Sequence, residues 1–236
     1  MRMLKLLLPK LPLIARVAVM HVLHLSEASK YLDLRSEVIL SVVRSMLEPS
    51  VPRAISTMQG YSIYETPIKG RLSISKYAAP APPEVDVRDA VMSVVADLAN
   101  EDASGLKLRV PDLVPVEAEW TGYRAKAAAG SAQANISEQE KYNDLLKDCT
   151  SPITILYFHG GAYYLMDPGT HRPTVKVLAK ITGGRAYSVR YRLAPQHPFP
   201  AALIDALMSY FTLLYPPPRA FHKPVKPEHI VFSGDR

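Results

Sequence analysis

The sequence predicts an α/β protein, in which a partial, mostly parallel sheet with flanking helices follows a helical N-terminal segment. Three observations support this fold class. From residue 153 onward, strand-like and helix-like stretches alternate, which is typical of a parallel sheet. The strand-like stretches are short and rich in β-branched and aromatic residues, as strands buried on both faces are. In the first hundred residues, apolar residues instead recur every third or fourth position, which indicates amphipathic helices.

Residues 1–105 are predicted to form the helical N-terminal or cap segment. Its first helix is expected at residues 13–24. A ladder of apolar residues four positions apart, from Leu34 to Met46, predicts the second helix, and prolines end it. A third helix is expected from Asp86 to Asn100, where four apolar residues share one face. The stretch 53–84 is mixed and predicts no regular element.

Residues 106–236 are predicted to form an incomplete α/β core. A half-buried strand is expected first, because apolar and polar residues alternate in "VPVEAEWTGYRA". An Ala-rich, polar stretch follows and reads as an insertion or an exposed helix. Short apolar runs and amphipathic runs then alternate to the end of the chain. The elements expected in this core are strand 114–125, insertion or helix 125–150, strand 153–158, helix 172–181, strand 185–191, helix 200–215 and strand 229–234.

Composition excludes several classes of protein. The chain has 236 residues, of which 48% are hydrophobic and 21% charged, so it is globular rather than disordered. The net charge of +6 comes from scattered Lys and Arg residues without a nucleic-acid-binding motif, so no nucleic-acid partner is expected. Cys149 is the only cysteine, which excludes an internal disulfide and a cysteine cluster for zinc. A lone thiol fits a cytoplasmic location.

The N-terminal stretch "MRMLKLLLPKLPLIARVAVMHVLHL" is apolar but interrupted. Prolines, Lys10 and Arg16 break it, so no uninterrupted run is long enough to span a membrane. Basic residues among the leucines leave two alternatives for this helix. It packs on the domain, which we favour, or it associates weakly with a membrane surface.

The first motif that carries chemistry is "FHGGAYY", directly after the strand expected at 153–158. Glycines there let the backbone turn sharply, and converging backbone N–H groups can stabilise an oxyanion. The alternative is an ordinary strand-to-helix turn. Lipases and esterases carry an HGGG-type loop at this place, and two further motifs in the expected order favour the oxyanion interpretation.

The second motif, "YRLAPQHPFPAALIDA", closely resembles the α/β-hydrolase family that includes hormone-sensitive lipase and related carboxylesterases. The resemblance implies an α/β-hydrolase fold, a carboxylic ester substrate and no cofactor. It implies a structural role for Tyr191, Arg192 and Asp205, with Arg192 and Asp205 holding the loop and helix near the active site. It argues against a catalytic role for His197, because the catalytic histidine of this family comes much later in the chain.

The third motif, "PEHIVFSGD", resembles the strand that leads to the G-D-S-A-G nucleophile turn of this family. Gly234 and Asp235 match the pattern, but Arg236 occupies the position of the expected serine. The resemblance implies that Gly160 and Gly161 donate the oxyanion hydrogen bonds, with Ala162 as the third position. His159 and Asp235 are expected to shape the loop.

The expected function is carboxylic ester hydrolysis of the esterase or lipase type, inherited from the family. These residues contain neither the nucleophilic serine nor the acid and histidine that would follow it, so we expect this chain to be inactive. Two accounts remain: a truncated product or gene model of a hydrolase, which we favour, or a non-catalytic pseudoenzyme. The pseudoenzyme would be an interaction or membrane-surface protein that keeps half of the hydrolase fold.

Overall fold

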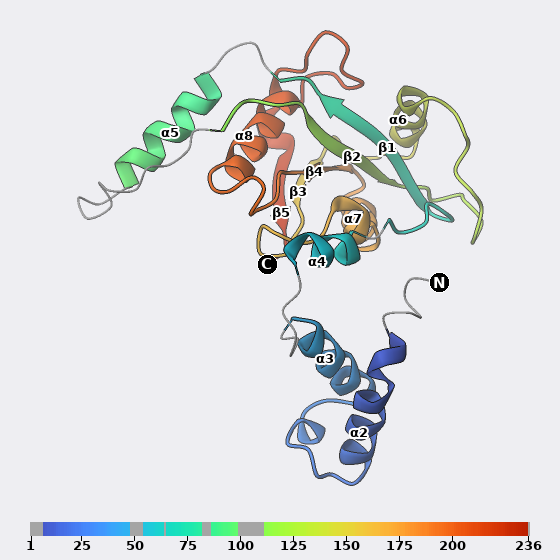
Figure 1. The fold of residues 1–236 in the computed structure, drawn as a ribbon. Helices are drawn as coiled ribbons and strands as arrows, with labels where there is room; N and C mark the ends of the chain where they lie inside the picture. The colour runs from blue at the N-terminus through green and yellow to red at the C-terminus, as the bar shows by residue number, and fades with distance from the viewer. Residues whose placement is uncertain (1–6, 48–53, 64, 82–85, 99–110, 236) are drawn as a thin grey trace. The chain divides into compact units, whose positions relative to one another are not determined.

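A computed structural model describes residues 7–47, 54–63, 65–81, 86–98 and 111–235 (Figure 1). The chain divides into two compact units, residues 1–54 and residues 55–236. Within the first unit the described elements are η1 (Leu8–Lys10), α2 (Leu11–Val22), η2 (Ala28–Lys30) and α3 (Leu34–Leu47). The two helices predicted for this region are therefore confirmed.

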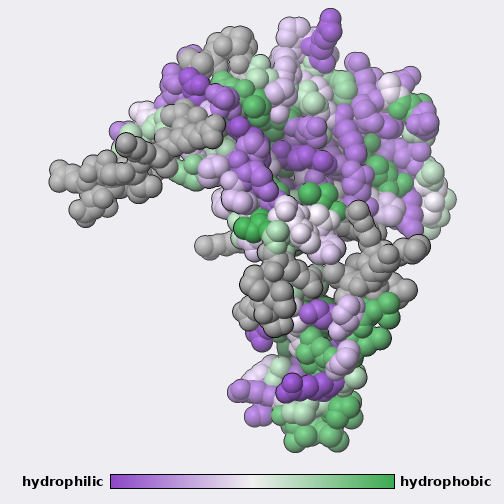
Figure 2. All heavy atoms as spheres, viewed as in Figure 1, coloured by the Kyte–Doolittle hydropathy of each residue, from purple (hydrophilic) through white to green (hydrophobic). Residues whose placement is uncertain are grey.

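A buried carboxylate links the two main helices of the first unit. Glu37 on α3 accepts hydrogen bonds from His21, at 2.5 Å, and from Ser26, at 3.1 Å. These bonds lower the pKa of the Glu37 carboxyl, with the His21 bond as the largest cause. Several apolar side chains of this unit stay exposed, and Figure 2 shows apolar surface over these helices.

The second unit is built on a five-stranded sheet in the order β1-β2-β4-β3-β5. Its strands are β1 (Leu72–Ala79), β2 (Val116–Tyr123), β3 (Thr154–Phe158), β4 (Arg185–Arg190) and β5 (Ile230–Gly234). The β3–β4 and β3–β5 pairs are parallel, as the alternating pattern predicts. The β1–β2 and β2–β4 pairs are antiparallel, so the sheet is mixed and is parallel only in its C-terminal part.

Helices cover both faces of this sheet. The described helices of the unit are α4 (Ile55–Ser62), α5 (Asp86–Leu98), α6 (Glu138–Lys147), α7 (Pro168–Thr182), α8 (Ala201–Leu214) and η4 (Pro227–His229). The larger core cluster joins one sheet face to α6 and α8 around Trp120, Leu156 and Tyr187. The smaller cluster joins the other face to α7 through Ile155, Tyr157 and Val175. The sheet is thus enclosed between two layers of helix, as an α/β fold requires.

Two elements differ from the sequence-based expectations. Residues 72–79, in the stretch with no predicted element, form β1, so the helical segment expected at 1–105 contains a strand of the sheet. The stretch 125–150 contains α6, which buries Tyr142 and Leu145 instead of lying fully exposed. Ser137 begins this helix with a capping box, in which its hydroxyl and the Glu140 side chain exchange hydrogen bonds with the backbone.

Among the described residues, no helix is both long and apolar enough to cross a membrane.

Candidate active site

Three parallel strands end at the same edge of the sheet, and the sequence motifs follow those ends. The loop 159–166 follows β3, Tyr191 and Arg192 follow β4, and Asp235 follows β5. In parallel sheets, ligands bind in the crevice beyond the carboxyl ends of the strands. The motifs that are far apart in the sequence therefore meet at the place where a site is expected.

The loop after β3 has a backbone that few side chains tolerate. Gly161, Ala162, Tyr163 and Met166 all have positive φ, at 115°, 52°, 61° and 71°. A Cβ atom on Gly161 would lie 2.3 Å from the carbonyl oxygen of Leu165, so this position requires glycine. Three non-glycine residues in left-handed conformations store strain that the surroundings must hold, which is common at functional sites.

Asp235 connects this loop to the end of β5. Its Oδ1 accepts hydrogen bonds from the Tyr157 hydroxyl, at 2.6 Å, and from the Gly160 N–H, at 3.0 Å. Its Oδ2 lies 3.0 Å from Nε2 of His171 on α7. Burial alone would raise the pKa of Asp235, but the bonds from Tyr157 and Gly160 and the neighbouring His171 outweigh it and lower that pKa.

The N–H groups of the loop divide into two kinds. The N–H of Gly160, which the motif predicts to be an oxyanion donor, is instead paired with Asp235. Among the described residues, no acceptor is paired with the N–H of Gly161 or of Ala162. Unpaired backbone donors beside a cavity are the groups that can bind an oxyanion.

His159 is a buried residue of the loop. Its Nδ1 lies 2.8 Å from the carbonyl oxygen of Gly160, and its ring stacks on Tyr191 with centroids 4.3 Å apart. The Tyr191 hydroxyl donates to the carbonyl oxygen of His159. Burial lowers the pKa of His159, so the ring is neutral at neutral pH.

Arg192 and Asp205 form a partly buried ion pair between the loop after β4 and α8. The Arg192 side chain lies 2.9 Å from Oδ1 of Asp205, and its backbone N–H donates to Oδ2 at 2.8 Å. Arg192 also donates to the carbonyl oxygen of Asp112 at 3.0 Å. Asp205 thereby binds both the backbone and the side chain of Arg192, which orients the loop over the first turn of α8.

The three strand ends border a cavity of about 1090 Å³. Most of its lining is apolar or aromatic, and its polar groups come from the loop, Arg192, His197 and Asp235. An apolar cavity with a few convergent polar groups is typical of small-molecule sites. The apolar and aromatic side chains of the lining are Phe158, Ala162, Tyr163, Tyr191, Ala194, Phe199, Pro200, Ala202, Leu203, Ala206 and Phe232.

The structure adds residues that the sequence motifs do not contain. Tyr157 and His171 bind Asp235, and Gln59 on α4 binds carbonyl oxygens of both loops. Arg236, the residue at the expected serine position, lies outside the described residues. His171 lies directly before the helix predicted at 172–181, and Gln59 lies in a stretch with no predicted element, so only their long-range contacts reveal them.

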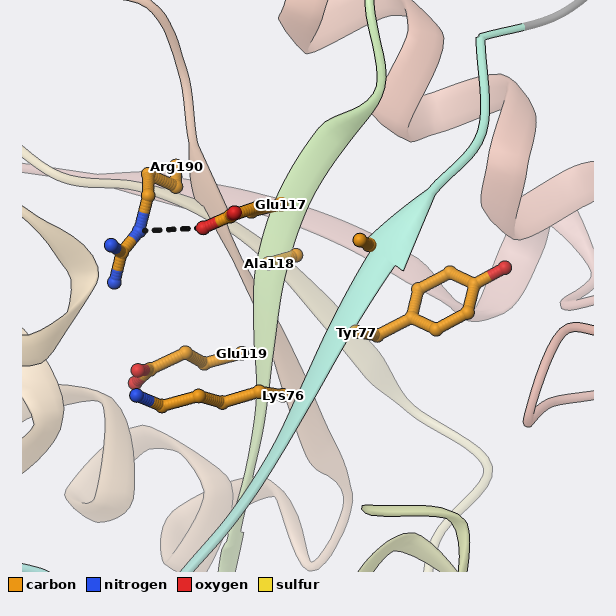
Figure 3. Close-up of a pocket in the computed structure, with 7 residues that line it drawn as sticks. Lys76, Tyr77, Glu117, Ala118, Glu119 and Arg190 are labelled. Atoms are coloured by element: carbon orange, nitrogen blue, oxygen red, sulfur yellow. Dashed lines mark ion pairs between the residues drawn. The ribbon is translucent and has the colours of Figure 1, made fainter.

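A second, smaller hollow of about 250 Å³ lies over β1 and β2 (Figure 3). Lys76, Glu119 and Arg190 extend to one side of these strands, whereas Tyr77 extends to the other. The charges are paired with one another: Arg190 lies 3.6 Å from Glu117, and Lys76 lies 2.9 Å from Glu65. Beneath them, Glu119 forms a fully buried ion pair with Arg172 of α7. These pairs join the sheet to α7. Each described charged side chain that lines this hollow already has an oppositely charged partner, so none is free to bind a ligand.

Known proteins resemble this chain over different parts of its length. A family model described as alpha/beta hydrolase fold matches residues 155–236. An acetyl-hydrolase of Streptomyces hygroscopicus is 43% identical over 61 residues, which are 26% of this chain and 20% of that protein. Lipase 2 of Moraxella sp. is 27% identical over 209 residues, which are 76% of this chain and 47% of the lipase. A solved hyperthermophilic esterase of the archaeon Pyrobaculum calidifontis aligns with a TM-score of 0.46 at 19% identity, covering 84% of this chain and 47% of that chain.

The chain spans less than half the length of each of these three proteins. The family match includes the end of β3, the loop 159–166, β4, α8 and β5, and thus all three motifs. By name, these two relatives are an acetyl-hydrolase and a lipase, which agrees with the resemblance seen in the motifs. Residues 155–236 of this chain thus match the alpha/beta hydrolase fold family, and the relatives that are similar to it over part of its length are an acetyl-hydrolase and a lipase.

Proposed function

We propose that the whole protein hydrolyses carboxylic esters and that residues 159–162 are its oxyanion loop. The observation that carries this proposal is that the N–H groups of Gly161 and Ala162 find no acceptor among the described residues, in a loop that lines the cavity at His159, Gly160 and Ala162. Backbone donors held in place before the reaction are worth most where negative charge develops. The substrate would be a small ester whose acyl or aromatic group fits the apolar cavity.

The proposal gives the neighbouring residues the following roles. Gly161 and Ala162 would donate to the oxyanion, whereas Gly160 would use its N–H to bind Asp235. Asp235 would fix the loop against the end of β5, immediately before the position of the nucleophile. His159, buried and neutral, would shape the loop by packing on Tyr191.

The mechanism would be that of a serine hydrolase. A serine hydroxyl attacks the ester carbonyl, its proton passes to a histidine, and the alcohol leaves as the acyl-enzyme forms. Water then releases the acid. These 236 residues contain Arg236 where the family places the serine, and arginine stays protonated and is no nucleophile. A polypeptide of these residues alone is therefore expected to be inactive.

Two measurements test this proposal: turnover of p-nitrophenyl butyrate, and the nucleotide sequence of the transcript beyond the codon for Asp235. The polypeptide of residues 1–236 should release no p-nitrophenol above the vector control. A transcript that continues with codons for Ser-Ala-Gly-Gly and on through the acid and histidine of the family should give a product that does. Turnover by the purified 236-residue polypeptide, retained through a second purification step, would show that the mechanism is wrong.

A second candidate is a non-catalytic role for residues 1–54 at a membrane surface. The observation that favours it is the exposed apolar stripe on α2, formed by Leu11, Val19 and Val22 and flanked by Arg16. An amphipathic helix with basic residues can lie in an anionic lipid interface. Co-sedimentation with phosphatidylserine vesicles tests this role, and equal recovery of the polypeptide with and without vesicles would exclude it. A cap function for the segment 1–105 remains a prediction beside it.

A further inference from the structure

Gln59 reverses the usual pattern of a surface helix. It is the buried residue of α4, with 9% of its surface exposed, whereas the other residues of this helix are partly or fully exposed. A surface helix normally buries apolar side chains, because a buried amide costs free energy unless its hydrogen bonds are made. The contacts of this side chain should therefore explain why it is buried.

The Gln59 amide joins two loops that border the cavity. Its Nε2 donates to the carbonyl oxygens of Tyr164 and Ala194, both at 2.9 Å. Its Oε1 accepts from Nε2 of Gln196 at 2.9 Å. The two loops are also bonded to each other, because the N–H of Ala194 donates to the carbonyl oxygen of Tyr163 at 2.9 Å. One side chain thus binds the loop after β3 and the loop after β4 at their point of contact.

A second residue of the same helix supports the far end of the loop. The Ser62 hydroxyl accepts a hydrogen bond from the N–H of Met166 at 2.9 Å. Ala162 and Tyr163, which have positive φ, directly precede the first attachment at Tyr164, and Met166, which also has positive φ, is itself the second. A strained segment of this kind keeps its conformation only where neighbouring groups determine it. Gln59 and Ser62, both on α4, supply such groups.

We propose that Gln59 is a positioning residue, which holds the N–H groups of Gly161 and Ala162 in the conformation that binds an oxyanion. It would act through the Tyr164 and Ala194 carbonyls and would touch neither substrate nor reacting atoms. The catalytic consequence rests on the proposed function. The ordering of the loop does not rest on it and can be measured without ester hydrolysis.

Amide hydrogen exchange of the 15N-labelled polypeptide of residues 1–236 tests this inference. Gln59→Met keeps the length of the side chain and removes its hydrogen bonds. It should speed exchange at the amides of Tyr164, Leu165, Met166 and Ala194 by about ten- to hundredfold, because two buried carbonyls lose their donor. The matched control is Gln133→Met, since Gln133 makes the same kind of paired bonds to the backbone of Ile74 in β1. The control should leave the four loop amides unchanged.

Gln59→Glu separates positioning from a general loss of stability. Its ionised carboxylate cannot donate, so near pH 7 it should speed exchange at the same four amides. The protonated carboxyl can donate one hydrogen bond, so protection relative to wild type at the same pH should partly return as the pH falls toward about 5. If Gln59→Met fails to fold, this pH series alone decides. Unchanged loop exchange, or an equal increase at the loop and in β3 and β4, would overturn the inference and leave the ester hydrolase proposal standing.

Discussion

The buried ion pair between Glu119 and Arg172 should be the most sensitive polar contact of the second unit. The side chains are 3% and 1% exposed and make two bonds, at 2.8 and 2.5 Å. Arg172 also donates to the carbonyl oxygen of Thr66 at 2.6 Å. The pair joins β2 to the first turn of α7, whose His171 contacts Asp235. A change here should therefore affect both the stability of the sheet and the position of the loop.

Glu119→Gln keeps the shape of the side chain and removes its charge, which leaves the buried Arg172 guanidinium with only Glu65, half exposed and 3.8 Å away, as a counter-ion. Breaking one partner of a buried pair costs about 3–5 kcal/mol, out of a total stability of about 5–15 kcal/mol. With a urea m-value of about 2 kcal/mol/M, the unfolding midpoint should fall by about 1.5–2.5 M. The transition can be followed by the fluorescence of Trp120, the only tryptophan, which is fully buried in the sheet.

An exposed pair is the control for this measurement. Asp144 and Lys147 lie 2.6 Å apart with side chains 53% and 76% exposed, so Asp144→Asn should cost at most about 1 kcal/mol. Replacing both buried partners, with Glu119→Leu and Arg172→Met together, should recover part of the loss because no lone charge remains buried. Equal midpoints for Glu119→Gln and Asp144→Asn would refute the reasoning.

Three further predictions concern the loop, the buried histidines and close backbone contacts. Burial lowers the pKa of His159 and of His222, so each binds a proton more readily when the chain is unfolded. The thermal unfolding temperature should therefore stay constant above about pH 6.5 and decrease below it. An unfolding temperature that stays constant down to about pH 5 would contradict this. Ala162→Gly should raise the free energy of unfolding by up to about 1 kcal/mol, because it relieves a φ of 52°, whereas Ala162→Val should lower it in the same urea titration. Gly184→Ala would place a Cβ 2.1 Å from a backbone carbonyl oxygen and should lower the free energy of unfolding by about 1–3 kcal/mol or more. In Gly60→Ala the new Cβ meets nothing within 4 Å, so this variant should stabilise α4. Equal urea midpoints for the two variants would show that the packing argument fails.

The sequence predicts the parallel half of the fold well, because its signals are local. β3, β4 and β5 are short apolar runs, and α7 and α8 are strongly periodic, so each is visible without knowledge of its neighbours. No local pattern predicts β1, because its residues lie between glycines and prolines, which indicate a loop. Its pairing with β2 depends on residues 37 to 51 positions away, from Ala79↔Val116 to Leu72↔Tyr123. Antiparallel pairing of β2 with β4 is likewise a tertiary contact that no local pattern contains.

The candidate site divides in the same way. The motifs predict which loops meet at the strand ends, and the structure brings the loop at Gly160 and Asp235 into contact across 75 positions of sequence. The partners that hold those loops could not be predicted. Gln59 and His171 reach them from helices whose own patterns indicate nothing about a site, and hydrogen bonds between distant side chains leave no periodic signal. The hydrogen bond from the Gly160 N–H to Asp235 is likewise visible only in the structure.

The most direct test of the central claim is a titration of the 15N-labelled polypeptide with sodium butyrate, a product mimic, followed at the backbone amides of loop 159–166. The carboxylate should occupy the place of the oxyanion. We predict saturable shifts at Gly161 and Ala162, with little change at Gly160, whose N–H is already bound to Asp235. Shifts that are absent at Gly161 and Ala162, or that are largest at Gly160, would contradict the claim that this loop is built to bind an oxyanion.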